Sequence, residues 1–156
     1  MTGVLGQSAL IAGTVSTGLI AGVFFAFSTS VMPGLAHTDD RTFVDAMQQL
    51  NVAILNPVFL LLFMAPLPAL GVAVITGPSR SWVIAALVLY VVAFGITMAG
   101  NIPLNDALMA AGLSDDASKL RAAREAFEDP WNRLHLIRTI GVVASFACCI
   151  GAALRA

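Results

Sequence analysis

The chain has 156 residues, of which 58% are hydrophobic and only 11% are charged, and its formal net charge is −1. A water-soluble domain carries roughly 25% charged residues, and a chain of this length could not bury so much apolar surface in water. The composition therefore predicts one integral membrane domain over residues 1–156. With no run of basic residues, it argues against a nucleic-acid partner.

Four segments are long enough to cross a bilayer, which requires about 20 apolar residues of helix. They cover residues 8–32, 52–76, 82–100 and 131–154. Transmembrane strands are a poor alternative, because the segments are too long and do not alternate polar with apolar residues. The sequence therefore predicts an all-α fold, a bundle of four membrane-spanning helices with the lipid bilayer as its partner.

The first span carries small residues and a cluster of aromatic residues. Gly18 and Gly22 fit the spacing that lets two membrane helices approach closely. Phe24, Phe25 and Phe27 either face lipid or form the walls of a pocket, and the lipid-facing arrangement is favoured. Such small-residue spacing is also compatible with a homo-oligomer.

Proline and glycine punctuate the second span and its exit. Pro66 and Pro68 predict a kink within the span. Residues 76–81 contain Gly77 and Pro78 and predict a tight turn into the third span.

The other two connections are longer and each contains a helix signal. Asp39 lies in a capping sequence ahead of an amphipathic stretch over residues 41–50, which we expect at the surface. Asp116 lies in a second capping sequence ahead of a short helix over residues 117–127. Pro130 is expected to end that helix and to open the fourth span.

Charge is distributed unequally between the two ends of the predicted bundle. Four spans place both termini and the second connection at one end, where the basic residues are Arg80 and Arg155. All nine acidic residues fall at the other end: Asp39, Asp40, Asp45, Asp106, Asp115, Asp116, Glu125, Glu128 and Asp129. Most Lys and Arg residues lie at that acidic end, which by their count would be cytoplasmic. Acidic residues balance them there, whereas the end with the termini has only basic residues, which favours cytoplasmic termini. The membrane orientation therefore stays open.

Polar residues at membrane depth cost free energy and are candidates for function. The strongest candidates all fall toward the acidic end of the bundle: Asn56, Asn101, Asn105, Trp131, His135 and Arg138. Intervals of four and three residues place the last three on one helix face. Arg138 lies about 10 Å along the helix from Trp131 and needs either a partner or a path to the interface. These residues predict a polar pocket with a ligand.

Each candidate also has a purely structural alternative. Trp131 could anchor the helix at the headgroup level, and Arg138 could extend its side chain to the interface. His135 could be a satisfied core residue, and each Asn could join two helices by a hydrogen bond. The scattered Met and His residues, and the adjacent Cys148 and Cys149, match no metal or thiol-redox spacing.

Three motifs together resemble the anthrone oxygenase-like family. They are the run over residues 21–28, the Asn-Ile-Pro-Leu-Asn motif over residues 101–105, and the helix face of Trp131, His135 and Arg138. The resemblance spans nearly the whole chain. It implies a four-helix membrane protein, mostly known from bacterial plasma membranes, with functions that are largely unknown.

For characterised relatives the resemblance implies a monooxygenase-type oxidation of an anthrone to an anthraquinone by molecular oxygen, without a metal or flavin cofactor. His135 would act as the base, because imidazole titrates near neutral pH. Arg138 would stabilise an enolate oxygen with help from Asn101 or Asn105, and Trp131 would stack on the ring. Asn56 would also contact the substrate.

Two further functions use the same features. The pocket could bind or transport a lipophilic small molecule without chemistry, or its polar face could contact a partner subunit. Proton-coupled pumping is disfavoured, because the predicted spans contain no acidic residue.

Overall fold

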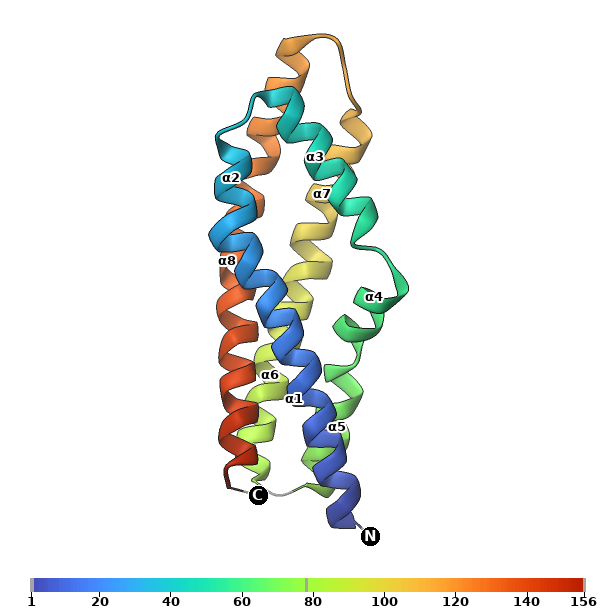
Figure 1. The fold of residues 1–156 in the computed structure, drawn as a ribbon, viewed down its shortest axis with the longest axis vertical. Coiled ribbons are helices and arrows are strands. Elements are labelled where there is room, and N and C mark those ends of the chain that lie inside the picture. Colours follow the sequence, from blue (N-terminus) through green and yellow to red (C-terminus); the bar gives the residue numbers. More distant parts are fainter. Residues whose placement is uncertain (1, 78, 156) are drawn as a thin grey trace.

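The computed structural model describes residues 2–77 and 79–155, and within them it contains only helices, turns and short links (Figure 1). Two of the long helices contain π-helical segments, η1 and η2. In chain order the elements are α1 (Thr2–Ala26), η1 (Phe27–Val31), α2 (Met32–Ala36), α3 (Asp40–Ala53), α4 (Pro57–Met64), α5 (Pro66–Thr76), α6 (Arg80–Ile96), η2 (Thr97–Asn101), α7 (Ile102–Ala111) and α8 (Ala117–Ala153).

Helices α1, α5, α6 and α8 pack side by side, each against two of the others, as a four-helix bundle. Four helical rods are long and apolar enough to cross a membrane: Gly3–Ala36, Pro57–Thr76, Arg80–Ala111 and Ala117–Ala153. The prediction of an all-α, multi-pass membrane bundle is confirmed. The first, third and fourth rods extend beyond the predicted apolar segments, because the helix continues past the end of each apolar run, whereas the second rod is shorter than predicted.

The termini and the connections lie at the two ends of the bundle as four spans predict (Figure 1). The α2–α3 and α7–α8 connections lie at one end, which we call the head end. The two termini and the α5–α6 connection lie at the other, which we call the terminal end. The predicted tight turn is at the terminal end, where Gly77 and Ser79 separate α5 from α6, and Pro78 lies outside the described residues.

Side-chain caps begin the two helices at the head end. Asp39 accepts a hydrogen bond from Thr42 N at the start of α3, and Asp116 accepts one from Ser118 N at the start of α8. Hydrogen bonds from Thr42 and Ser118, through side chain and backbone, lower the pKa of each aspartate. The stabilisation by both caps is therefore present at neutral pH and is lost as the pH falls through these lowered pKa values.

Helix α3 confirms the predicted amphipathic helix and adds a buried face. Phe43, Val44 and Met47 are completely buried in an apolar cluster with residues of α7 and α8. Gln48 also reaches α7, where Nε2 donates to Leu108 O at 2.8 Å. Helix α3 therefore closes the head end over the membrane bundle, while its opposite face remains exposed.

Two predicted helix boundaries were wrong. Pro130 does not end a helix, because α8 continues through it from Ala117 to Ala153. A proline inside a helix costs one backbone hydrogen bond, and the packing of α8 against α3, α6 and α7 outweighs that loss. The second span begins at Pro57 rather than at residue 52, because α3 extends to Ala53 and Asn56 caps a new helix. The predicted kink is confirmed at Ala65, where α4 ends and Pro66 opens α5.

Glycines allow close contact at some of the predicted positions. A Cβ atom added at Gly18 would lie 2.7 Å from the ring of Phe146, whereas one added at Gly22 would meet nothing within 4 Å. Of the two glycines predicted to allow close helix approach, Gly18 therefore does so and Gly22 does not. Gly6 is tighter, because a Cβ there would collide with backbone atoms of Thr76 and Gly77 where α1 crosses the end of α5.

We expect Gly6→Ala and Gly22→Ala to change the thermal midpoint in opposite directions. Backbone at Gly6 cannot yield as a side chain can, so overpacking there costs about 1–3 kcal/mol. At Gly22 the same change only stiffens the helix, a gain of roughly 0.5–1 kcal/mol. Thermal unfolding of both variants in one detergent is the measurement. Equal shifts would show that the backbone of α1 at Gly6 does not contact the end of α5.

Candidate functional site

A cavity of about 350 Å³ lies in the head half of the bundle, between α1–η1, α3–α4, η2–α7 and α8. Six aromatic residues form part of its wall: Phe24, Phe27, Phe59, Phe63, Phe94 and Trp131. Its polar lining comes from Asn51, Thr97, Asn105, His135 and Arg138. An apolar chamber with a few converging polar groups is the usual form of a small-molecule site.

Arg138 is the cation of this cavity and is only 7% exposed. Its Nε donates to His135 Nδ1 at 3.1 Å, and its Nη1 donates to Thr97 Oγ1 at 3.1 Å. The guanidinium lies over the ring of Phe24, 4.4 Å from the centroid. No carboxylate of residues 2–77 or 79–155 forms an ion pair with it. An arginine stays charged, so this arrangement leaves a buried positive charge without a counter-ion.

His135 is held in one tautomer by its two neighbours. Nδ1 accepts from Arg138, which can only donate, so Nδ1 carries no proton. Nε2 lies 3.0 Å from Phe24 O, which can only accept, so Nε2 carries the proton. The imidazole is therefore neutral and both of its nitrogens are engaged. Its lone pair fixes the direction of the Arg138 guanidinium.

Trp131 covers His135 and extends the polar network to α7. The indole stacks on the imidazole with ring centroids 4.6 Å apart, and its Nε1 donates to Asn105 Oδ1 at 2.8 Å. Because Asn105 Oδ1 accepts this bond, its amide nitrogen Nδ2 points away from Trp131 and can donate hydrogen bonds to another group. Trp131 is 3% exposed, so its indole packs inside the bundle and does not face outward as an anchor in the headgroups would.

The comparison with protein families matches this region of the chain. A family model described as anthrone oxygenase matches residues 43–148, about two thirds of the 156 residues. The chain belongs to the anthrone oxygenase family. Neither the curated proteins nor the solved structures compared with it give a match. The suspected resemblance is thus confirmed, and membership in the anthrone oxygenase family supports an oxygenase-like function at that coarse level.

All of the polar lining, together with Trp131, lies inside the segment that the anthrone oxygenase model matches: Asn51, Thr97, Asn105, His135 and Arg138. The Phe24 end of the cavity lies outside that segment. Among the described residues, no group of three or more His, Cys, Asp or Glu side chains is arranged to hold a metal ion.

Two predicted site residues of this anthrone oxygenase family member do not line the cavity. Asn56 is exposed and caps α4: its Oδ1 accepts from Phe59 N, and its Nδ2 donates to Ala53 O. Asn101 is completely buried and joins two helices, because its Nδ2 donates to Trp131 O at 3.2 Å. The structure brings Asn105, Trp131, His135 and Arg138 together and leaves Asn56 apart.

The sequence analysis missed Thr97, Asn51 and the role of two phenylalanines. Thr97, with Asn101 and Asn105, recurs every fourth residue, a signal that was available in the third span. Asn51 ends an amphipathic helix and had no such signal. Phe24 is buried and Phe27 lines the cavity, so the lipid-facing expectation was wrong for both. It holds for Phe25, which is 58% exposed.

Both π-helical segments flank the cavity. In η1 the Met32 N–H donates to Phe27 O, and in η2 the Ile102 N–H donates to Thr97 O, each spanning five residues instead of four. The extra residue rotates the side chains that follow, which is how a straight helix can redirect a few residues inward. Single π turns often occur at functional sites.

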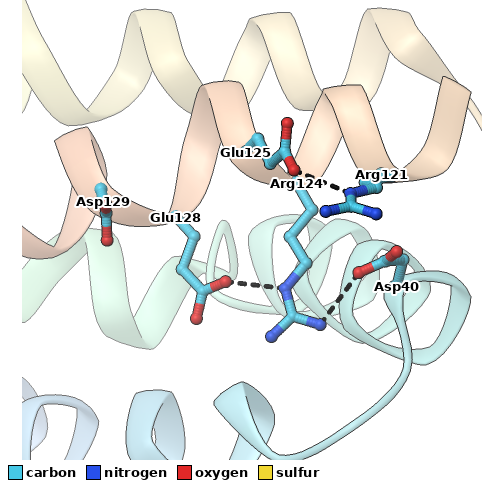
Figure 2. A pocket seen from close by; sticks show the side chains of 6 residues that line it. All are labelled: Asp40, Arg121, Arg124, Glu125, Glu128 and Asp129. Carbon is cyan, nitrogen blue, oxygen red and sulfur yellow. Dashed lines mark hydrogen bonds and ion pairs between the residues drawn. The ribbon is translucent and has the colours of Figure 1, made fainter. Parts of the chain in front are cut away.

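A separate polar recess lies outside the cavity, at the head end (Figure 2). Arg124 occupies its centre and pairs with Asp40 and Glu128 at 3.1 and 2.7 Å. The same guanidinium donates to Ala36 O, at the end of α2, and to Thr38 O, in the link that follows α2. Arg124 therefore ties α8 to the α2–α3 connection and closes the end of the bundle.

We expect Arg124→Gln to lower the thermal midpoint by about 3–6 °C, because two backbone carbonyls and two carboxylates lose their donor. Arg121→Gln is the matched control, since Arg121 is exposed and pairs only with Glu125, four residues away. Pairs of that kind contribute little. A thermal unfolding series in detergent compares the two. If Arg121→Gln is as destabilising as Arg124→Gln, the head end is not held by Arg124.

Proposed function

We propose that this protein is a cofactor-independent oxygenase that oxidises a lipophilic anthrone- or quinol-like aromatic, in a bacterial plasma membrane. The observation that carries the proposal is Arg138, a buried guanidinium without a carboxylate partner, at the wall of an apolar cavity. A ligand oxygen that bears negative charge would supply the missing counter-ion. Charge-assisted hydrogen bonds of this kind are among the stronger ones.

The shape of the wall favours a flat aromatic ligand. Phe63 and Phe94 stack with ring centroids 5.2 Å apart, and Phe59 and Phe63 stack with centroids 5.7 Å apart. Such faces pack against planar rings with little loss of side-chain freedom. Asn105, whose Oδ1 is engaged by Trp131, has its amide N–H groups left for a second ligand oxygen.

The proposed reaction converts one ring CH₂ group and one O₂ into a ketone and one H₂O. Loss of a proton from the CH₂ carbon gives an enolate, whose oxygen lies at Arg138. The enolate passes one electron to O₂, and the resulting carbon radical and superoxide combine into a peroxide anion. Return of the proton gives a hydroperoxide, which eliminates water and leaves the ketone. Arg138 lowers the barrier by stabilising the enolate before it reacts.

His135 has two roles in this proposal. In the unliganded site its lone pair holds Arg138 in position. When the guanidinium turns toward the ligand oxygen, Nδ1 becomes free to take the proton from the ring carbon and to return it to the peroxide.

Oxygen consumption by the purified protein in lipid nanodiscs tests the proposal. With 9-anthrone we expect uptake above the spontaneous rate, with one O₂ used for each anthraquinone formed. Protein-free nanodiscs provide the background rate. Saturable binding of anthraquinone without any acceleration would contradict the oxygenase and leave the alternative, a non-catalytic binder or carrier of lipophilic aromatics.

A further inference from the structure

The cavity reaches the lipid-facing surface of the bundle. Its inner wall is buried, with Phe24 only 3% exposed and Arg138 7% exposed. Four other residues that line the same cavity are exposed: Leu55 (66%), Leu60 (41%), Met64 (49%) and Met98 (50%). Leu60 and Met64 belong to α4, Met98 belongs to η2, and Leu55 lies in the link before α4, so the mouth lies between η2 and α4 with the link that precedes it.

The mouth lies within the apolar part of the bundle. Leu60 and Met64 belong to the rod Pro57–Thr76, and Met98 belongs to the rod Arg80–Ala111, both of membrane-spanning length and hydropathy. The four exposed side chains are apolar. A route from water would cross polar residues at the surface, whereas this mouth meets the hydrocarbon of the bilayer.

Helix α4 borders this mouth and is separated from its neighbours along the chain. The link over residues 54–56 precedes it, and a break at Ala65 follows it. It packs against α1 and α5. In Figure 1, α4 bends away from the axis of the bundle, while Phe63 near its end stays joined to α6, because Tyr90 Oη donates to Phe63 O at 2.7 Å. The cavity reaches the surface beside this segment, at the exposed side chains of Leu60, Met64 and Met98.

We infer that the ligand is an aromatic compound with an apolar chain, whose oxygen-bearing ring lies against Arg138 while its chain passes between α4 and η2 into the bilayer. The inference rests on the proposed function and names its substrate class. A buried charge at the inner end and an apolar mouth in the membrane match a molecule with one polar end and one apolar end. Such a ligand enters laterally from the lipid and never leaves the apolar phase.

Quenching of Trp131 fluorescence tests the inference without depending on turnover. A Trp82→Phe background removes the second tryptophan, which lies at the terminal end against Gly151 and Arg155. The probes are two 2-hydroxy-1,4-naphthoquinones, one with a methyl and one with a decyl substituent at the neighbouring carbon. Their concentrations are expressed as mole fractions in the lipid of the nanodisc, so that the different partitioning of the two probes between water and lipid does not affect the comparison of their binding constants.

In the starting protein we expect both probes to bind with constants within about threefold of each other, because the decyl chain stays in lipid whether free or bound. The double variant Met64→Phe/Met98→Phe narrows the mouth and should weaken the decyl probe about tenfold while changing the methyl probe little. Val88→Phe/Val92→Phe is the matched control, since both valines are exposed on α6 and neither lines the cavity.

Each other outcome overturns the inference. Binding of the methyl probe alone would mean a closed chamber without a mouth. Equal weakening of both probes by the Met64→Phe/Met98→Phe variant would mean that no chain occupies the mouth. Failure of both probes to quench Trp131 would overturn the ligand site itself, and with it the proposed function.

Discussion

Arg138→Gln is expected to reduce the rate of anthrone oxidation by about 10²–10³, the usual cost of removing a donor to a developing oxyanion. Glutamine keeps a polar side chain, but it is shorter than arginine and carries no charge. In the same helix, Arg133 is exposed and does not line the cavity, so Arg133→Gln is the matched control. Its rate should equal that of the unchanged protein. Initial rates of oxygen uptake at saturating anthrone provide the comparison.

Thermal stability separates a functional role of Arg138 from a structural one. Because Arg138 forms no ion pair with a described carboxylate, Arg138→Gln should leave the thermal midpoint unchanged or raise it. A variant that loses activity while keeping its stability fits a charge retained for a ligand. Full activity in Arg138→Gln, or a parallel collapse of stability, would contradict the role assigned to this residue.

Substitutions of His135 should separate its effect on ligand binding from its effect on the rate of oxidation. His135→Asn places an amide oxygen near the position of Nδ1, so it can still accept from Arg138 Nε, but it cannot take a proton. We expect this variant to bind anthraquinone like the unchanged protein and to oxidise anthrone about 10²–10⁴ times more slowly. His135→Ala should lose a comparable rate and should also bind about tenfold more weakly, since the unliganded Arg138 is then no longer held at the cavity wall and must be ordered when the ligand binds.

The binding measurement and the rate measurement each test a different role of His135. Turnover by His135→Asn at the unchanged rate would remove the role of His135 as a base. Binding by His135→Asn as weak as that by His135→Ala would remove its role in positioning Arg138. Anthraquinone binding by fluorescence and initial rates of oxygen uptake give both quantities on the same preparations.

Most of the fold could be predicted because it depends on strong local signals. Runs of about 20 apolar residues require a membrane, and a membrane requires helices whose backbone is satisfied internally. Capping at Asp39 and Asp116 and the kink at Pro66 are also local, and the structure has all three. The prediction that Pro130 ends a helix was wrong, because the effect of this proline on α8 depends on packing with other helices, which no local sequence pattern contains.

The site could be predicted only where helix periodicity brings residues together. Trp131, His135 and Arg138 share one face of α8, and the structure assembles them as the spacing predicts. Asn56 was chosen for its polarity and Asn101 also for the motif over residues 101–105, but their amides are used in a cap and in a bond between helices. Thr97 joins the site through η2, whose π turn changes the direction of the side chains, and that change is a property of backbone bonding.

A structure of the protein with anthraquinone bound, in a lipid environment, tests the central claim most directly. The claim is that the Arg138 cavity is a ligand site. We predict a flat molecule against Trp131 and the Phe63 ring, with one of its oxygens within hydrogen-bonding distance of the Arg138 guanidinium. A ligand bound elsewhere, with Arg138 still directed only at His135 and Thr97, would contradict it.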